Sequence, residues 1–269
     1  MATDKGNRKI MDIVDLSFSY GDMQILKNVN FRAYQGQLVA LIGPNGAGKS
    51  TLFKCILKFL KGYSGHIYLE GEDMLQMTRP QIAKKIAYIP QTTVPVFNYE
   101  VLDIVLMGLT GSLNLLESPK AEHVAKAEAI LKDLGILHLR NRGFGRISGG
   151  ERQLVLLARA IIQDAKILVM DEPTANLDYG NQFRVMEGIR RLVTKGYTVI
   201  LSTHNPEHAL LFAEKAFVLK DGEVKAAGPS KEVLTEELMK ELYDVEVRLL
   251  DTEYHGEAAK VCVPIRSTR

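Results

Sequence analysis

The sequence predicts an α/β fold with a mostly parallel sheet, an N-terminal antiparallel β piece and an all-helical insert. Three observations support this prediction. Short apolar runs that are typical of buried strands alternate with helical segments, which indicates a mostly parallel sheet. Two segments near the N-terminus alternate apolar and polar residues, as half-buried antiparallel strands do. From Tyr99 to about Arg142 the chain changes to helical character.

Composition excludes several classes of protein. The chain has 269 residues, of which 46% are hydrophobic and 25% charged, so it is neither wholly disordered nor fibrous. Its net charge of +2 is too small to indicate a nucleic-acid partner through bulk charge. The N-terminus has no apolar signal core, and no apolar run approaches the ~18 residues of a membrane span, so we expect a cytoplasmic chain. Cys55 and Cys262 are too few for a zinc cluster and are expected to be unpaired.

The elements before residue 90 are mainly strands. Apolar residues at every second position from Val14 to Tyr20 predict a half-buried strand, Gly21-Asp22 a turn, and the alternation at 29–33 an antiparallel partner. The continuous apolar run 38–42 is typical of a strand buried on both faces, and it leads into a glycine-rich loop. After the loop we expect a helix and two further strands, at about 50–60, 65–69 and 86–89.

The helical insert contains one well-marked helix. Ser118 is expected to be its N-cap, with Pro119 at the first helical position. Apolar residues then recur at helical spacing, and Gly135 ends the run. These apolar residues are Val124, Ala127, Leu131 and Leu134.

Strands and helices alternate again after the insert. Helices are expected from Ser148 to about Ile161 and from Val185 to Leu192. The last strand of the sheet ends at the turn Asp221-Gly222, and two alternating runs around Gly256 predict a small hairpin in the tail. The expected strands of this half are 167–170, 199–201, 217–219, 245–250 and 260–265.

Residues 43–51 read GPNGAGKST and fit the phosphate-loop pattern G-x-x-x-x-G-K-[ST]. Glycines let the backbone curl so that N–H groups point at phosphate oxygens, and the following helix places its positive N-terminus under the same phosphates. Lys49 supplies a positive charge to the β and γ oxygens, Ser50 offers a hydroxyl to magnesium, and Thr51 reaches an α-phosphate oxygen. A glycine-rich turn that only caps a helix is the alternative, but the strand before it and the helix after it favour a P-loop NTPase core. The loop residues assigned to the nucleotide are Gly43, Pro44, Asn45, Gly46, Ala47, Gly48, Lys49, Ser50 and Thr51.

Residues 166–174, KILVMDEPT, form an apolar strand that ends in two acids. Asp171 is placed to hold magnesium, directly or through water. Glu172 is then predicted to be the general base, or at least the group that orients the attacking water. Taken alone, the pair would favour a strand that simply emerges into solvent. With a phosphate loop upstream, the catalytic interpretation is favoured.

Residues 147–151 read ISGGE and open an apolar helix. Ser148 and Glu151 form the pattern S-x-x-E, a capping box that requires no ligand. Capping does not explain Gly149 and Gly150, which indicate that some group closely approaches the helix N-terminus.

With these motifs in this order, the chain resembles the ATP-binding subunit of an ABC transporter, over roughly Ile10 to Leu250. In that family the loop at 147–151 is the signature motif, usually LSGGQ. The resemblance implies that Ser148, Gly149, Gly150 and Glu151 contact the ATP of a partner subunit. Ile147 and Glu151 depart from the motif, and Glu151 keeps the capping-box geometry that Gln would supply.

The resemblance also implies further roles and the cofactors ATP and Mg²⁺. Tyr20 matches the aromatic residue that stacks on adenine, with a core position on its strand as the alternative. Gln91 matches the glutamine that senses magnesium and the γ-phosphate, and Asp178 matches the acid of the loop that crosses the dimer. His204 matches the switch histidine that contacts the γ-phosphate, with a structural or merely exposed histidine as the alternative. The expected catalytic residues are Glu172, His204, Lys49 and Gln91, and the expected metal ligands are Ser50, Gln91 and Asp171.

The partners implied by the resemblance are a second copy and a membrane permease. Two copies pair head to tail in a two-fold homodimer, so that each ATP lies between Lys49 of one chain and Ser148 and Gly150 of the other. The dimer closes on the γ-phosphate and opens after hydrolysis, and the permease responds. The chain is therefore expected at the cytoplasmic face of the cell membrane, with an extracytoplasmic substrate-binding protein acting indirectly and no nucleic acid.

The segment 92–101 carries no charge before Glu100 and suits a groove that receives a short permease helix. Core packing is the alternative, and it is preferred for Val101. Two longer stretches, 101–119 and 220–250, resemble importers of iron-siderophores, haem and cobalamin and related molybdate importers. The other function left open is that of a soluble ABC ATPase without a permease, such as an iron–sulfur assembly factor. A DNA-repair ATPase would need a longer, coiled-coil insert between Gln91 and Ser148.

The expected domain organisation has one ATPase domain and a tail. The ATPase domain is expected to span 1–250, with a nucleotide-binding core at about 9–90 and 152–240 and a helical insert at about 92–150. The tail is expected at 251–269.

Overall fold

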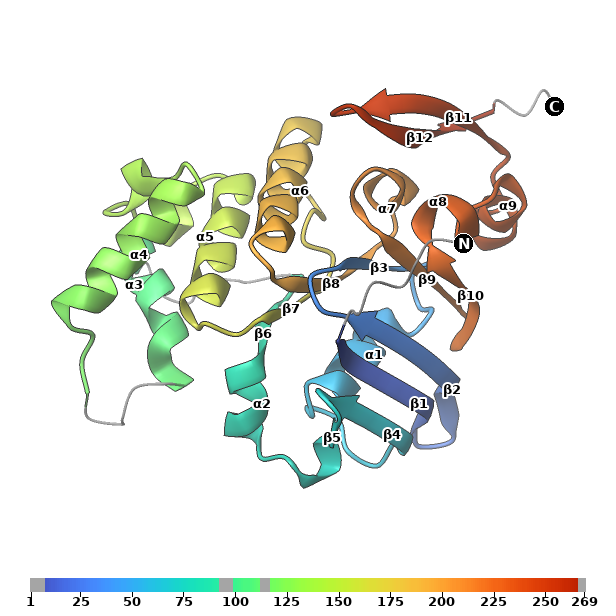
Figure 1. The fold of residues 1–269 in the computed structure, drawn as a ribbon, viewed down its shortest axis with the longest axis horizontal. Helices are drawn as coiled ribbons and strands as arrows, with labels where there is room; N and C mark the ends of the chain where they lie inside the picture. Colours follow the sequence, from blue (N-terminus) through green and yellow to red (C-terminus); the bar gives the residue numbers. More distant parts are fainter. Residues whose placement is uncertain (1–7, 92–98, 112–116, 266–269) are drawn as a thin grey trace. The chain divides into compact units, whose positions relative to one another are not determined.

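The computed structural model describes residues 8–91, 99–111 and 117–265. The chain divides into two compact units (Figure 1). Unit 1 comprises the described parts of Met1–Met77 and Thr198–Arg269, and unit 2 comprises those of Thr78–Tyr197. Parallel strands, an antiparallel N-terminal sheet and helices confirm the predicted α/β class.

Unit 1 contains two larger sheets, with helix α1 between them, and a separate two-stranded sheet at its C-terminal end (Figure 1). The first sheet, ordered β2-β1-β4-β5, is antiparallel throughout, which confirms the predicted N-terminal piece. In the second sheet β3 pairs in parallel with β8 and β9, and β10 pairs antiparallel with β9. The strands are β1 (Lys9–Tyr20), β2 (Met23–Tyr34), β3 (Leu38–Ile42), β4 (Ser64–Leu69), β5 (Glu72–Asp73), β8 (Thr198–Thr203), β9 (Lys215–Lys220), β10 (Glu223–Pro229), β11 (Val247–Tyr254) and β12 (Glu257–Pro264). The helices are α1 (Lys49–Ile56), the 3₁₀ turn η1 (Met74–Gln76), α7 (Pro206–Phe212), α8 (Ser230–Val233) and α9 (Glu236–Tyr243).

Strand β1 begins earlier than predicted and is not regular. Asp15 has a φ of 50°, and the pairing of β1 with β2 shifts register between Ile13 and Leu16. This irregularity changes the phase of the buried side chains between Ile13 and Leu16. The alternation predicted from Val14 is present up to Phe18, since Leu16 and Phe18 are buried and Asp15 and Ser17 are not, whereas Tyr20 is exposed. The central strand β3 is buried at every residue, as predicted for a strand covered on both faces.

Helix α1 ends at Ile56, earlier than the predicted end at Leu60. Lys58 adopts a left-handed backbone with a φ of 55°, which cannot continue a helix. Its Nζ donates to the carbonyl oxygens of Met74 and Met77, at 3.0 and 2.6 Å. The chain therefore leaves α1 where this lysine turns toward η1.

The predicted C-terminal hairpin is confirmed as β11 and β12, which turn at His255-Gly256. The hairpin packs on α7 and α9 of unit 1 (Figure 1). The ring of Tyr254 in β11 meets Phe212 of α7 edge-on, with centroids 5.7 Å apart. This contact and the burial of Cys262 attach the tail to the body of unit 1.

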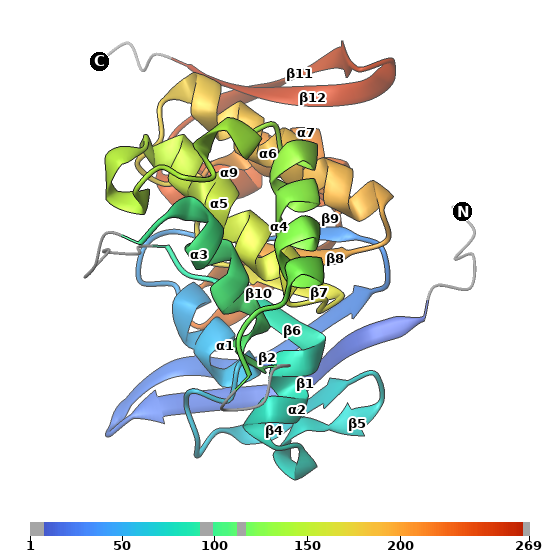
Figure 2. The ribbon, with the colours of Figure 1, turned by 90° about the vertical axis from the view of Figure 1, so that its left-hand side faces the viewer.

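Unit 2 combines a parallel strand pair with a group of packed helices. Helices α3, α4 and α6 each contact α5 (Figure 2). Strand β6 pairs in parallel with β7, and both strands were predicted from their apolar runs. The elements are α2 (Arg79–Lys85), β6 (Ile86–Ile89), α3 (Val101–Leu106), η2 (Met107–Gly111), α4 (Ala121–Asp133), η3 (Leu137–Leu139), η4 (Phe144–Arg146), α5 (Gly149–Ile162), β7 (Ile167–Met170) and α6 (Tyr179–Thr194). No helix among the described residues is long and apolar enough to span a membrane.

The predicted N-cap of α4 is wrong. The helix begins at Ala121 with Lys120, not Ser118, as its N-cap. The backbone N–H of Lys120 donates to Nδ1 of His123 at 3.0 Å, so a histidine satisfies the donor that a capping box usually assigns to Glu or Gln. Pro119 therefore precedes the cap. The predicted end at Gly135 is confirmed, with a φ of 74°.

Candidate functional site

The phosphate loop and His204 leave the second sheet of unit 1 at the same edge. Strands β3 and β8 run parallel with Ile42 opposite Thr203. The next residues along the chain are Gly43 and His204, so both follow the carboxyl ends of neighbouring strands. This edge is where open α/β sheets bind ligands. His204 is exposed there.

The loop between β3 and α1 requires its glycines. Gly46 and Gly48 have φ values of 83° and 104°, a left-handed backbone that L side chains rarely adopt. A Cβ on Gly43 would lie 2.1 Å from the backbone oxygen of Leu219, so a neighbouring strand packs against the loop. The helix starts directly behind, with Leu52 N–H donating to Gly48 O at 2.9 Å. The loop is thus a tight turn over a helix N-terminus, the geometry that binds phosphate.

Lys49 holds a positive charge within this loop. The residue is 5% exposed, and its Nζ donates to the carbonyl oxygens of Gly43 and Pro44 at 2.7 and 3.1 Å. Burial of the stem and these two bonds place the ammonium group beside the loop backbone. Along the rest of the loop, Ala47 is buried, Pro44 and Thr51 are half-buried, and Asn45, Gly46 and Ser50 are exposed.

Tyr20 is exposed at the end of β1. Its exposed fraction of 47% contradicts the alternative in which it is a core residue. The ring meets Phe18 edge-on, with centroids 4.9 Å apart, which leaves aromatic surface open to solvent. Phe18 pairs with Leu26 across the hairpin. A Cβ added to Gly48 of the phosphate loop would lie 2.9 Å from Leu26 Cδ2. The hairpin that carries Tyr20 is therefore packed against the phosphate loop.

The backbone just after His204 is held by α7. Asn205 caps this helix through a bond from Glu207 N–H to its Oδ1, at 2.9 Å. Its Nδ2 lies 3.4 Å from Nε2 of His208, which is buried. Burial, with a smaller contribution from His204, lowers the pKa of His208 to about 4, so this imidazole is neutral near pH 7. The sequence analysis gave His208 no role. The pattern Asn205-Pro206 nevertheless indicates the start of the helix that carries His208.

In unit 2 the two acids and Gln91 follow neighbouring strands in the same way. Ile89 of β6 pairs with Met170 of β7, and Asp171 N–H donates to Ile89 O at 2.9 Å. Gln91 Nε2 then donates to Glu172 Oε2 at 3.3 Å. The structure therefore brings together two residues that the sequence separates by a whole helical insert.

The two acids have different surroundings. Asp171 is 6% exposed, whereas Glu172 is half-buried. Glu172 also has a φ of 45°, which is unusual for a residue with a side chain and is found more often at functional sites. Burial and the nearby Asp171 carboxylate raise the pKa of Tyr88 to about 12. These differences agree with separate tasks for the two carboxylates.

The capping box at the start of α5 is confirmed. Ser148 N–H donates to Glu151 Oε2 at 2.8 Å, and Glu151 N–H donates to Ser148 Oγ at 3.3 Å. The bond from the Ser148 backbone is the main reason that the pKa of Glu151 is lowered. Glu151 therefore performs the capping expected of Gln and carries a negative charge at neutral pH.

Asn181 packs directly against the signature loop, and sequence reasoning missed it. A Cβ on Gly150 would lie 2.5 Å from Asn181 Cγ, and one on Gly149 would lie 3.1 Å from Leu177 Cδ2. The close approach that these glycines indicated is therefore made by the chain's own residues. Asp178 is the N-cap of α6 and accepts from the backbone N–H of Asn181 at 2.9 Å.

Each unit carries oxygen groups of the kind that magnesium prefers. Ser50 of unit 1 presents an exposed hydroxyl and Asp171 of unit 2 carries a carboxylate, and both are hard donors. In the part of the chain that the structure describes, no group of three or more His, Cys, Asp and Glu residues forms a metal site by itself. An ion that takes most of its ligands from water and phosphates needs no such group.

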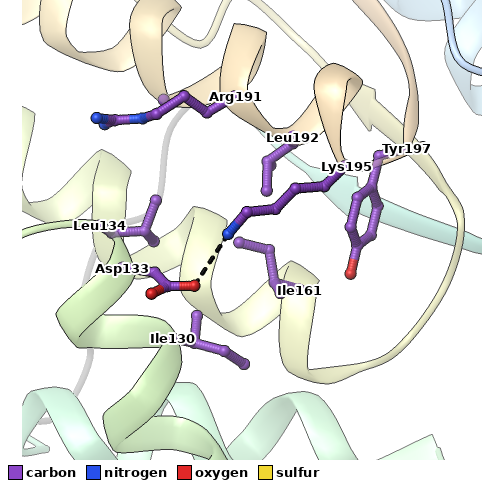
Figure 3. A pocket seen from close by; sticks show the side chains of 9 residues that line it. Ile130, Asp133, Leu134, Ile161, Arg191, Leu192, Lys195 and Tyr197 are labelled. Atoms are coloured by element: carbon purple, nitrogen blue, oxygen red, sulfur yellow. Dashed lines mark hydrogen bonds and ion pairs between the residues drawn. The ribbon is translucent and has the colours of Figure 1, made fainter.

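Two cavities of unit 2 are lined by residues other than the assigned catalytic ones. One of about 220 Å³ lies between α4, α5 and α6, where Ile130, Leu134 and Ile161 face one another and Lys195 Nζ pairs with Asp133 Oδ2 at 2.9 Å (Figure 3). A hollow of about 580 Å³ is lined in part by Glu151 and Asn181.

The predicted permease contact lies largely outside the described residues. This holds for residues 92–98 of the segment 92–101. Val101 is buried, which confirms its preferred assignment to the core, and Tyr99 is 45% exposed.

Comparison with known proteins shows one family. The family described as ABC transporter matches residues 26–175. A probable iron chelatin transport ATP-binding protein of Helicobacter pylori is 35% identical, over 87% of this chain and 93% of the relative. A molybdate import ATP-binding protein of Haemophilus influenzae is 31% identical, over 97% of this chain and 98% of the relative. Among solved structures, a metal-chelate type ABC transporter in an inward-facing conformation has a chain that superposes with a TM-score of 0.84 at 32% identity, covering 97% of this chain and 99% of that one.

Proposed function

Because the chain belongs to the ABC transporter family, as an ATP-binding subunit that hydrolyses ATP, we propose that it energises an importer of a metal chelate or of molybdate. The observation that carries this proposal is similarity over nearly the full length to relatives of that kind and to a metal-chelate transporter chain. Metal chelates are the first choice, with iron-siderophores, haem and cobalamin as the candidates. No comparison favours an ATPase without a permease.

We propose roles in ATP binding and hydrolysis for residues of each unit. In unit 1, Tyr20 stacks on adenine, the loop 43–51 with Lys49 holds the phosphates, and His204 contacts the γ-phosphate. In unit 2, Glu172 accepts a proton from the attacking water, and Gln91, which donates to Glu172 Oε2, orients that carboxylate. Ser50, Gln91 and Asp171 would hold Mg²⁺, which when bound neutralises part of the phosphate charge. The domain assignment, with a core at about 9–90 and 152–240, remains a proposal.

Subunits of this family act as dimers with membrane permeases. We infer that Ser148, Gly149, Gly150 and Glu151 contact ATP held by a second copy, and that Asp178 lies at that interface. The segment 92–101 is proposed to meet the permease. The chain would then work at the cytoplasmic face of the cell membrane, and an extracytoplasmic protein would deliver the cargo.

Uptake by membrane vesicles tests the importer proposal. The chain is coexpressed with a candidate permease, and labelled ferric siderophore, haem, cobalamin and molybdate are supplied in turn. We expect ATP-dependent accumulation of one of these cargoes and none with the Glu172→Gln variant. A chain that hydrolyses ATP at full rate, is recovered without a membrane protein and supports no uptake would instead be an ATPase without a permease.

Tyr20→Ala is expected to weaken ATP binding, and Tyr20→Phe to leave it nearly unchanged. Stacking of a base on an aromatic ring contributes about 1–3 kcal/mol, so Kd should rise by about 5- to 150-fold in the alanine variant. Met23 pairs with Tyr20 across the turn and is 68% exposed, so Met23→Ala is the matched control and should bind like the parent. Titration with a fluorescent ATP analogue measures all three. Parental affinity in Tyr20→Ala would show that the ring does not contact adenine.

A further inference from the structure

The starting observation is a contact inside unit 2 between two loops that are far apart in the sequence. The dimer loop, residues 174–178, ends at the N-cap of α6, and the signature loop, residues 147–151, opens α5. Leu177 lies over Gly149, and Asn181 lies over Gly150, which is buried. Two successive glycines are thus covered by two side chains from one segment.

Asn181 is held firmly on the other side. Its backbone N–H donates to Asp178 Oδ1 at 2.9 Å, and its Nδ2 donates to Asp178 Oδ2 at 2.6 Å. Both oxygens of one carboxylate are therefore used to orient one asparagine. The side-chain Oδ1 also accepts from Arg184 Nη1 at 3.5 Å, so the side chain cannot swing away without losing charge-assisted bonds to both Asp178 and Arg184.

The contact with Gly150 leaves no free space. A Cβ at that position would lie 2.5, 2.6 and 2.7 Å from Cγ, Oδ1 and Cβ of Asn181, well inside normal van der Waals separation. The amide group of Asn181 therefore rests on the α-carbon of Gly150. Any displacement of Asn181 displaces the start of α5, where the capping box of Ser148 and Glu151 is formed.

We propose that Asn181 is a positioning residue that joins the dimer loop to the signature loop, so that Asp178 and Ser148 are presented to a second copy as one rigid surface. This inference rests on the proposed role of both loops in contacting the ATP of a partner subunit. It also assigns a structural reason for glycine at 150, namely the space taken by Asn181. Asparagine suits the task because it donates to Asp178 while presenting a flat, short group to the glycine.

The first test measures the signature loop without any partner. Hydrogen exchange is followed in the nucleotide-free chain carrying Asn181→Ala. We expect exchange at the amides of residues 149–152 to quicken about tenfold, with amides of α1 unchanged. Equal exchange in parent and variant would overturn the inference, and this result does not depend on whether a dimer forms.

The second test uses dimers trapped by ATP in the Glu172→Gln background, measured by analytical ultracentrifugation. Gly150→Ala and Asn181→Ala should each raise the ATP concentration needed for dimerisation about tenfold or more, while ATP binding by the monomer stays within twofold of the parent. Gly180→Ala is the matched control, because a Cβ there lies at an ordinary 3.6 Å from Asp178 Oδ1.

The decisive comparison is a double-mutant cycle between the two positions. Asn181→Gly removes all three atoms that an alanine at 150 would meet, so the double variant Gly150→Ala/Asn181→Gly should be no more defective than Asn181→Gly alone. If the losses of the two single variants multiply in the double variant, the two positions act independently and the inference is wrong. If Gly150→Ala does not fold, the inference is tested with Asn181→Ala alone. Unchanged dimerisation of that variant would reject the inference. If the Glu172→Gln chain forms no ATP-dependent dimer, the proposed dimer is rejected instead. The hydrogen-exchange comparison of the parent and Asn181→Ala would still test the role of Asn181.

Discussion

Glu172→Gln should lower the rate of ATP hydrolysis by about 10² or more, the usual contribution of a positioned acid–base group. Glutamine keeps the volume of the side chain and an oxygen that can accept from Gln91 Nε2, the bond that measures 3.3 Å in the parent. The substitution removes only the capacity to take a proton. ATP affinity should survive, because Lys49, Ser50 and the loop amides are unchanged.

The same variant should accumulate as a closed dimer. Two chains that bind ATP and do not hydrolyse it remain paired, so a monomer should shift to a dimer on a sizing column when ATP is present. Single-turnover hydrolysis and the sizing profile are the two measurements. Hydrolysis at the parental rate would reject Glu172 as the base and direct attention to His204.

Asp171→Asn is the matched control for this prediction. The residue is adjacent and loses the same charge, but it is 6% exposed and is assigned to magnesium rather than to water. We expect magnesium-dependent activity to be lost without so stable an ATP-trapped dimer. If both variants trap the dimer equally, the division of tasks between the two acids is incorrect.

Lys49→Ala is expected to abolish useful ATP binding and, with it, any ATP-dependent dimer. Lys49 is buried, and its Nζ donates to the oxygens of Gly43 and Pro44, so the charge is already oriented in the loop before a nucleotide arrives. Truncating one partner of a buried charged contact costs about 2–5 kcal/mol, which raises Kd at least ~30-fold.

Thermal unfolding with and without ATP measures this loss. At an ATP concentration of about 100 times the parental Kd, the parent gains about 2.7 kcal/mol, whereas Lys49→Ala should gain less than ~1 kcal/mol. Lys54→Ala is the control, because Lys54 is an exposed lysine on the same helix. Equal stabilisation of Lys49→Ala and the parent would show that Lys49 does not contact the phosphates.

The motifs with local chemistry were predictable from the sequence. The loop 43–51, the capping box of Ser148 and Glu151, and the acids after 167–170 each depend on residues a few positions apart, so their patterns carry their geometry. The strand 38–42 was recognisable for a similar reason, since burial on both faces requires a continuous apolar run.

Errors arose where a specific contact overrides a local preference. Helix α1 ends before Leu60, and Lys58 there bonds to the segment 74–77. Helix α4 begins after Pro119, since His123 accepts from Lys120. Strand β1 begins at Lys9, before the predicted start at Val14, because a shift of pairing with β2 near Asp15 changes the phase of burial and the residues before it do not continue the alternation. In each case the local signal existed, but a specific hydrogen bond or register decided the outcome.

The sequence by itself determined which chemical groups this protein brings to a nucleotide. The residues of each motif lie within a short stretch of backbone, so their arrangement is set locally. Tertiary structure alone decided which of these groups meet. It joined Gln91 to Glu172 through the parallel pairing of β6 and β7, and it placed Asn181 on Gly150 through the packing of α6 against α5. Such contacts follow from how whole elements pack. The sequence around one residue of a pair does not indicate which residue is its partner.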